Sequence, residues 1–308
     1  MNITVIINQM IQLFLVIALG YFLYKVNIFD DQLNKKFSTL LLSVTTPAMI
    51  LASVTTGNNF APIERVMLVS VITVAYFIIV PIFSYLIIGL SPMKNENKGL
   101  FIFMTIFSNV GFMGFPVISA IFGQDAIFYV AIFNLGFNFM IFSFGRLILE
   151  YEKSSKFVFD YHIFLTPGII CSILALVIYG FKITVPSVLG QTFDLVGGMT
   201  TPIAMLIIGS NLAKIPLKEV FNDIYLYIYT MIRQIIIPII AITILKYLIQ
   251  DEYIMGIIFV IIAMPVATSA VMFATEYRGD VVQASKSVFL TTLCSVVTIP
   301  LLVYFYLT

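Results

Sequence analysis

Apolar runs of about twenty residues recur throughout this chain of 308 residues. A helix needs roughly 20 apolar residues to cross the hydrocarbon core of a bilayer. Only 10% of the residues are charged, against about 25% in a soluble domain, and the mean hydropathy is +1.08. The composition therefore predicts an all-α integral membrane protein. We expect ten transmembrane helices, at residues 5–25, 37–56, 66–90, 99–122, 126–148, 162–181, 188–211, 224–249, 253–275 and 282–306.

Positive side chains are distributed unevenly between the two sets of loops. Loops after the odd-numbered spans hold eleven Lys and Arg residues, whereas the opposite loops hold only Arg65, Lys182 and Lys246. Positive residues collect on the cytoplasmic side, so we expect a multi-pass protein of the cell membrane with both termini extracytoplasmic. The first run lacks a positive leading region and a cleavage site, which favours a retained span over a signal peptide. No basic cluster indicates a nucleic-acid partner.

The sequence also repeats itself. TTPAMIL at 45–51 returns as TTPIAML at 200–206, and GQDA at 123–126 resembles RGDV at 278–281, both at an offset of 155 residues. Two prolines of the first half have counterparts at similar offsets, although proline recurs in membrane helices in any case. Because each half holds five spans, an odd number, the second half enters from the opposite side of the membrane. We expect two inverted five-helix repeats, over residues 1–150 and 151–308.

One apolar run carries its own helix-breaking residues. In SNVGFMGFPVISAIFG at 108–123, an asparagine, two glycines and a proline fall between Ser108 and Pro116, and glycine and proline are unfavourable inside a helix. At the corresponding place in the second half, AMPVATSAVMFATEYRGD puts Pro265 near the middle of span nine. Helices interrupted at matching places in two repeats point to a transport site. Their free N-termini suit an anion, and their freed carbonyls suit a cation.

Four motifs resemble the auxin efflux carrier family. NVGFMGFP resembles its N-x-G-x-x-G-x-P in span four, FNLGFNFMIFSFG its Asn-bearing span five, GSNLAK the end of span seven, and MPVATSAVMFATEYRGD its C-terminal motif. The resemblance implies a sodium–bile-acid-symporter-like fold in which broken helices 4 and 9 cross. It also implies a transport domain of spans 3–5 and 8–10, a scaffold of spans 1, 2, 6 and 7, and a homodimer. The chain departs from the family at Ser269, where asparagine is frequent, which weakens any inference of auxin-like specificity.

The candidate substrate-binding residues lie in and around the two breaks. Arg233 is among them because an ionisable residue inside a span is a functional candidate, although a long side chain can also snorkel to the interface. Asn109 can contact substrate or cap the broken backbone, the two glycines can serve a close helix crossing, and the span-five asparagines can join helices by hydrogen bonds. The full set is Asn109, Gly111, Gly114, Pro116, Asn134, Asn138, Arg233, Pro265, Thr268 and Ser269.

Structural roles are expected for most other polar residues. Asp125 and Asp280 should cap spans five and ten, and Lys286 should snorkel. Cys171 and Cys294 lie in apolar runs and should be buried and unpaired; with a single histidine, His162, no metal site or cofactor is predicted. Hydroxyls can satisfy carbonyls freed by Pro47 and Pro202, or line a substrate path, at Thr45, Thr46, Thr200 and Thr201.

Three classes of function fit these observations to different degrees. The leading interpretation is a secondary carrier working by alternating access, and the resemblance implies a small organic anion, a mono- or dicarboxylate such as malate or malonate, with protons or Na⁺ as possible coupling ions. A cation–proton antiporter or Na⁺-coupled carrier of the same fold is the alternative, but spans four, five and nine lack carboxylates at mid-depth. A sensor on this scaffold stays open. No nucleophile–base pair or catalytic motif predicts an enzyme.

Overall fold

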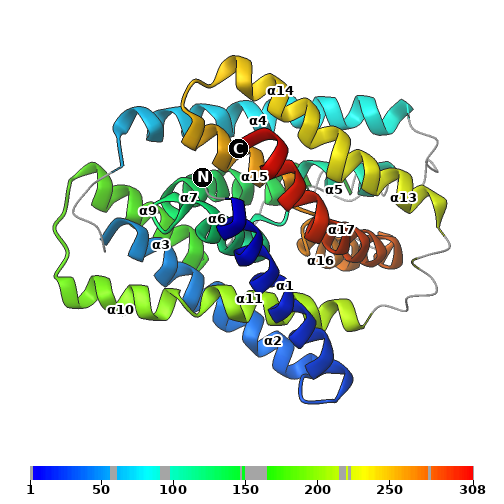
Figure 1. Cartoon of the computed structure of the whole chain (residues 1–308), viewed down its shortest axis with the longest axis horizontal. Coiled ribbons are helices and arrows are strands. Elements are labelled where there is room, and N and C mark those ends of the chain that lie inside the picture. Colours follow the sequence, from blue (N-terminus) through cyan, green and yellow to red (C-terminus); the bar gives the residue numbers. More distant parts are fainter. Residues whose placement is uncertain are drawn as a thin grey trace.

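The computed structural model describes residues 3–55, 61–90, 98–145, 148–149, 165–214, 220, 223–276 and 279–307, and it is built from helices (Figure 1). Within these residues, five helical stretches are long and apolar enough to cross a membrane: Asp31–Thr55, Ile63–Leu90, Ser187–Ala213, Ile224–Leu248 and Val281–Leu307. Shorter apolar helices cover Ile11–Lys25, Val110–Phe122, Ala126–Met140, Pro167–Gly180 and Glu252–Ala263. Helix is therefore present in the described part of every predicted span. The inverted relation of the two halves remains a prediction.

One group of helices is held together by close backbone contacts. It comprises α1 (Ile3–Lys25), α2 (Asp31–Leu40), η1 (Leu41–Thr45), α3 (Thr46–Thr55), α9 (Pro167–Gly180), α10 (Ser187–Gly197) and α11 (Thr200–Ala213). A Cβ atom on Gly209 would overlap the backbone of Ile17, and one on Gly197 would lie 2.7 Å from the Cα of Met49. Such small residues let membrane helices approach closely. As a result, α1 packs along α11, and α3 packs along α10.

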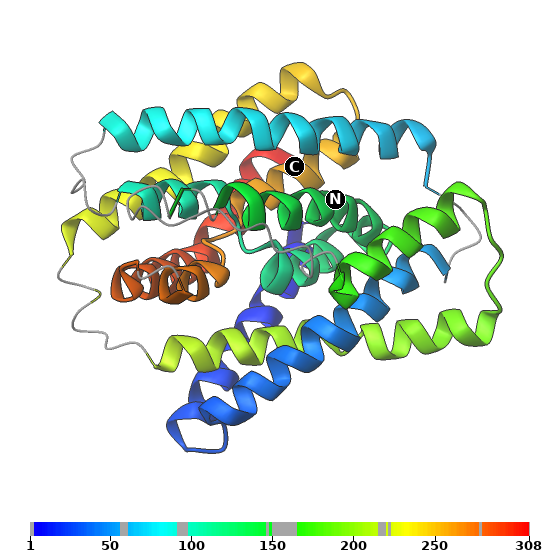
Figure 2. The ribbon, with the colours of Figure 1, turned by 180° about the vertical axis from the view of Figure 1, so that it is seen from behind.

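A second group surrounds the two helix breaks. Its members are α4 (Ile63–Leu90), α5 (Lys98–Ile106), η3 (Val110–Gly114), α6 (Phe115–Phe122), α7 (Ala126–Met140), η4 (Ile141–Gly145), α13 (Ile224–Met231), η6 (Ile232–Ile236), α14 (Ile237–Leu248), α15 (Glu252–Ala263), α16 (Ser269–Glu276) and α17 (Val281–Leu307). Figures 1 and 2 show α4 and α14 along one side of the molecule and α10 and α11 along the other, with α6 and α7 between them. The breaks therefore lie among the elements of this second group.

Helix α4 has one apolar face turned outward and one turned to the core. Met67, Val71, Val74 and Ile78 are each at least 59% exposed and recur every three or four residues. The opposite face buries Val69, Thr73, Tyr76 and Phe77. An exposed apolar stripe of this length is unfavourable in water but is suited to lipid chains.

Three of the π-helical turns have the same local cause, a proline two residues after the turn. Thr46, Phe115 and Ile237 each donate their N–H to the carbonyl five residues earlier. The next residue in each case is a proline: Pro47, Pro116 and Pro238. A proline ring clashes with the carbonyl four residues before it, and a widened turn relieves that clash. Pro81 and Pro300 lie inside α-helix, so proline does not always produce a π turn.

Two of the expected helix caps have different outcomes. The Asp280 carboxylate accepts the Gln283 N–H at 2.9 Å at the start of α17, which confirms that cap. The prediction for Asp125 is wrong, because its side chain makes no capping bond and its backbone is already helical.

The expected bond from a threonine hydroxyl to a freed carbonyl is absent at Thr46 and Thr200. Thr45 bonds Leu41 O, but the hydroxyls of Thr46 and Thr200 are buried without a partner. Because α11 begins at Thr200, Pro202 lies in its first turn, where proline frees no helical carbonyl.

Three further predictions concern isolated side chains. Cys171 and Cys294 are free thiols and are half-buried, whereas full burial was expected. Lys286 is half-buried in the second turn of α17. His162 lies outside the described residues.

Candidate substrate-binding site

The two interrupted helices meet at their breaks. Helix α5 ends at Ile106 and η3 begins at Val110, while α15 ends at Ala263 and α16 begins at Ser269. The unwound segments pair as a short antiparallel bridge between Ser108 and Val266. Its two bonds run from Asn109 N–H to Pro265 O, at 2.8 Å, and from Ala267 N–H to Phe107 O, at 3.1 Å. Backbone groups freed by each break are thus partly satisfied by the other break, and we call this junction the crossing.

Neighbouring helices satisfy further groups at the crossing. The Tyr76 hydroxyl, on α4, donates to Ile106 O at 2.9 Å, at the C-terminal end of α5. The Thr291 hydroxyl, on α17, accepts the Val266 N–H at 3.2 Å. Sequence reasoning missed both residues, because a tyrosine or threonine within an apolar helix gives no sign of which distant carbonyl or N–H it meets.

Arg233 lies in the π turn η6 and is 1% exposed. Its Nη1 donates to Ile262 O at 2.8 Å, in the last turn of α15, and its Nη2 donates to Ser108 Oγ at 2.9 Å. One side chain therefore joins both breaks. The snorkelling alternative is wrong for this residue, because the guanidinium is held inside the protein. A π turn inside an α-helix frequently marks a functional site.

The positive charge of Arg233 has no fixed counter-ion in the described part of the chain. Arginine keeps its charge in proteins and can only donate hydrogen bonds. The buried polar side chains of that part include no aspartate and no glutamate, and Arg233 takes part in neither the Arg65–Asp251 nor the Lys214–Asp31 ion pair. Its Nε has no hydrogen-bond acceptor. A buried charge is costly unless it is paired, so the site is suited to an anion that comes from outside.

Other unpaired polar groups lie in the same breaks. Asn109 is 2% exposed and its Nδ2 has no partner; the Ser269 Oγ is also buried without one. The capping interpretation of the Asn109 side chain is wrong, because it makes no capping bond to η3. Buried donors in native proteins normally have a partner or an ordered water, so these groups are available to a ligand.

The glycines of the first break leave space and do not mediate a close crossing. A Cβ atom on Gly111 would have no heavy atom of another segment within 4 Å. For Gly114 the nearest atom is Val110 Cγ1 at 3.3 Å, in its own helical turn. The close-approach alternative is therefore wrong for both residues. Open space beside Gly111 adjoins the start of η3, whose first N–H groups have no partner within the helix.

The remaining predicted residues differ in their relation to the crossing. Pro265 is part of the bridge, Thr268 directly precedes α16, and Pro116 lies buried in the first turn of α6. The Asn138 amide donates to Asn134 O at 2.7 Å within its own helix. Among the described residues, neither Asn138 nor Asn134 makes a side-chain hydrogen bond to the crossing, and neither joins α7 to another helix in this way.

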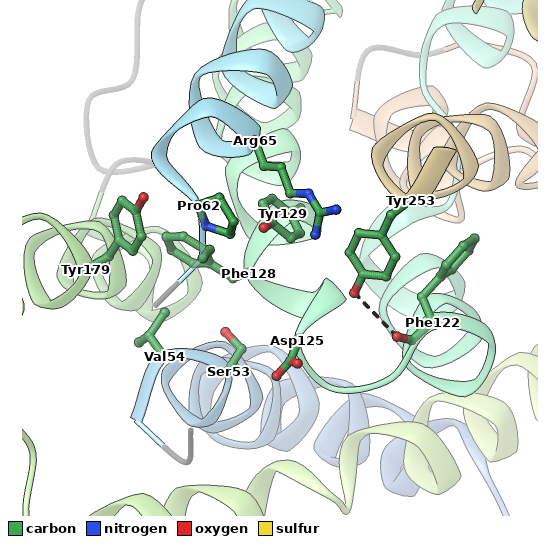
Figure 3. A pocket seen from close by; sticks show the side chains of 11 residues that line it. Ser53, Val54, Pro62, Arg65, Phe122, Asp125, Phe128, Tyr129, Tyr179 and Tyr253 are labelled. Atoms are coloured by element: carbon green, nitrogen blue, oxygen red, sulfur yellow. Dashed lines mark hydrogen bonds between the residues drawn. The ribbon is translucent and has the colours of Figure 1, made fainter. Parts of the chain in front are cut away.

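A cavity of about 340 Å³ lies at the far ends of the half-helices (Figure 3). Phe122, at the end of α6, and Tyr253, at the start of α15, both line it, and the Tyr253 hydroxyl donates to Phe122 O at 3.4 Å. The eight residues of α6 span roughly 12 Å by helical rise, so the cavity and the crossing are separate places joined by these helices. Residues from both helix groups line the cavity, including Ser53 of α3 and Tyr179 of α9.

Arg65, which lines the cavity, forms an ion pair with Asp251. Arg65 Nε lies 2.6 Å from Asp251 Oδ2, and its guanidinium lies over the Tyr253 ring, 5.1 Å from the centroid. Burial alone would raise the pKa of the Asp251 carboxyl, but hydrogen bonds from the Ile254 N–H and from Arg65 hold that pKa below its usual value. Asp251 is thus ionised at neutral pH and already pairs with Arg65. In the described part of the chain no three His, Cys, Asp or Glu side chains group as a metal site.

Known proteins resemble this chain over nearly its whole length. A family model described as membrane transport protein matches residues 5–303. An uncharacterized transporter of Methanocaldococcus jannaschii is 25% identical over 292 residues, which are 93% of this chain and 94% of that one. The uncharacterized transporter YfdV of Escherichia coli is 22% identical over 316 aligned positions, covering 98% of each chain. Together with the crossing, these matches show that the chain is a multi-pass membrane protein of the membrane transport protein family, to which the auxin efflux carriers belong.

Proposed function

We propose that this transporter is a secondary carrier for a small organic anion, held at the crossing by Arg233. The observation that carries the proposal is the buried guanidinium with an unpartnered Nε and no buried carboxylate among the described residues. Charge-assisted hydrogen bonds to a carboxylate are about twice as strong as neutral ones. A carboxylate at this place would neutralise the charge and satisfy the donor in one step.

The same observation weighs against the cation-carrier alternative. A site for Na⁺ or protons in a membrane carrier needs carboxylates, or carbonyls that are free to coordinate. Here the carbonyls of Ile106, Ile262 and Pro265 each already accept one hydrogen bond, from Tyr76, Arg233 and Asn109, which leaves each of them one lone pair. A positive guanidinium would also repel a cation at short range. Proton or Na⁺ coupling elsewhere in the chain stays open to the experiment below.

Alternating access requires two bodies that move past one another. The packing of α1–α3 against α9–α11 supports a scaffold of spans 1, 2, 6 and 7, and we propose a transport domain of spans 3–5 and 8–10 around the crossing. We propose two inverted halves, over 1–150 and 151–308, on the repeats in the sequence alone. The cavity of about 340 Å³ between Ser53, Tyr179 and the ends of α6 and α15 suits a vestibule between these bodies. We propose extracytoplasmic termini and a homodimer on the sequence expectations alone.

Flux into proteoliposomes tests this function. Purified wild-type protein should take up a labelled small carboxylate, and Arg233→Gln should abolish uptake while Lys25→Gln, a change in an exposed side chain far from the crossing, should leave it intact. Uptake with and without Na⁺ and a pH gradient identifies the coupling ion. Binding without flux would support a sensor. Equal uptake by wild type and Arg233→Gln would refute the assignment of the site.

A further inference from the structure

We infer that the crossing is built for a ligand with one negative charge, a monocarboxylate and not a dicarboxylate; this inference rests on the proposed function. The sequence leaves open whether the substrate is a mono- or a dicarboxylate, and this inference chooses the monocarboxylate. The inference comes from the charges that surround the place where the two breaks meet.

The helix ends at the crossing cancel in pairs. Two half-helices begin there, at Val110 and Ser269, and two end there, at Ile106 and Ala263. Each N-terminus carries about +0.5 elementary charge and each C-terminus about −0.5. The two C-terminal ends are also occupied, since Ile106 O accepts from Tyr76 and Ile262 O accepts from Arg233. The helices as a set therefore add no net charge.

Among the fully buried side chains of the described residues, Arg233 alone supplies a formal charge to the crossing. It is the only Lys, Arg, Asp or Glu among the buried side chains of the described residues. A monoanion would bring the buried site to zero net charge. A dianion would leave one negative charge buried without a partner, which is as unfavourable as the unpaired guanidinium itself.

The free hydrogen-bond donors at the crossing also suit a single carboxylate group. The guanidinium has five N–H groups, and its Nη1 and Nη2 each use one on the protein, leaving Nε without an acceptor. Asn109 Nδ2 and the Ser269 hydroxyl are two further buried groups at the breaks without a partner. One carboxylate, with two oxygens, can accept from this set. No second cationic side chain is buried in the described part of the chain to receive another carboxylate.

The charges of the empty and the loaded crossing also determine which step of the transport cycle depends on the membrane potential. The empty crossing carries one positive charge and the loaded crossing carries none. Only the empty site does electrical work if it moves across the membrane field. Exchange of internal for external monocarboxylate, in which the loaded form alone moves, should therefore have the same rate at any voltage, whereas net flux should change with voltage.

Succinamate and succinate form a matched ligand pair, because they are nearly equal in size and differ by one charge at neutral pH. Their affinities for the wild-type protein should be measured by thermal shift and by competition for uptake in proteoliposomes. We expect succinamate to bind at least tenfold more tightly. Equal or tighter binding of succinate would overturn the monoanion inference while leaving anion transport intact. Binding of neither ligand nor any smaller carboxylate would instead contradict the proposed function.

Two further measurements keep the test independent of any one ligand. The exchange rate of the best monocarboxylate should not change when a potassium diffusion potential is imposed; a rate that follows voltage would show that the loaded site is charged. Ser269→Lys adds a second cation beside the break and should shift preference toward succinate. If this variant folds, measured by its melting profile, and still prefers succinamate, the charge-matching inference is wrong.

Discussion

The two helix breaks differ in the residues that satisfy their freed backbone N–H and C=O groups. The first, at residues 107–109, carries its own polar side chains, Ser108 and Asn109, and continues into a π turn ahead of Pro116. The second, at residues 264–268, has no polar side chain before Thr268: Thr291 of α17 accepts its Val266 N–H, and Arg233 of η6 caps the helix that precedes it. The first break also receives one group from another helix, the Tyr76 hydroxyl on Ile106 O.

This difference separates structural from functional polar groups. Thr291 and Arg233 serve the second break through bonds to its backbone, so their removal should cost stability. The Asn109 amide nitrogen has no protein partner, so its removal should cost ligand binding. Arg233 belongs to both classes, because it bonds each break and its Nε has no partner.

The largest effect is expected at Arg233. Arg233→Met removes the charge, and the loss of charge-assisted bonds, about 1.5–3 kcal/mol, should weaken carboxylate binding roughly 10- to 100-fold. Arg233→Lys keeps the charge but cannot bridge Ile262 O and Ser108 Oγ together, so it should retain part of the affinity. Titration of each purified variant with a carboxylate measures this, and equal affinities for Met and Lys variants would show that charge is irrelevant.

Asn109→Ala should reduce transport roughly two- to tenfold with little loss of stability. The change removes a buried donor that has no partner in the protein, and a hydrogen bond lost to the ligand is worth about 0.5–1.5 kcal/mol. Flux and melting temperature should be measured on the same preparation. A large fall in melting temperature with normal flux per folded molecule would assign Asn109 to the structure alone and erase the contrast between the two breaks.

Thr291→Val should show the opposite pattern. It leaves the buried Val266 N–H without an acceptor, which costs about 1–3 kcal/mol of stability, while substrate affinity should remain within a factor of two or so of wild type. Thr243→Val is the matched control, because the Thr243 hydroxyl is exposed and bonds only Ile239 O in its own helix. If Thr291→Val and Thr243→Val have the same melting temperature, the hydrogen bond from the Val266 N–H to Thr291 does not stabilise the second break.

The smallest effect on the fold is expected from Gly111→Ala. Its Cβ would enter open space, and alanine in a helical turn is favoured over glycine by up to about 1 kcal/mol, so stability should be unchanged or slightly raised. The added methyl would occupy space beside the ligand and should lower affinity. Gly209→Ala provides the contrast, because its Cβ would overlap the Ile17 backbone and should destabilise the protein. Unchanged affinity for Gly111→Ala would move the ligand away from this break.

Periodicity and composition predicted the helices and the position of both breaks, because Asn109, Pro116 and Pro265 interrupt otherwise apolar runs. The family resemblance was also confirmed. The depth of Arg233 could not be predicted, since a long side chain near a helix end can reach water or the core, and only tertiary packing decides. Thr291 and Tyr76 were missed for a related reason: their partners are far away in sequence. The Asp125 cap failed because the chain reaches α7 already helical at that residue.

The most direct test of the proposed site is to locate a bound anion. A crystal of the wild-type protein grown with 3-bromopropionate can be measured at the bromine absorption edge, with Arg233→Met as the control. The buried, uncompensated guanidinium predicts an anomalous peak at the crossing, beside Arg233 and Asn109, that disappears in the variant. A peak confined to the cavity at Arg65, or one that persists unchanged in Arg233→Met, would contradict the assignment of the anion site to the crossing.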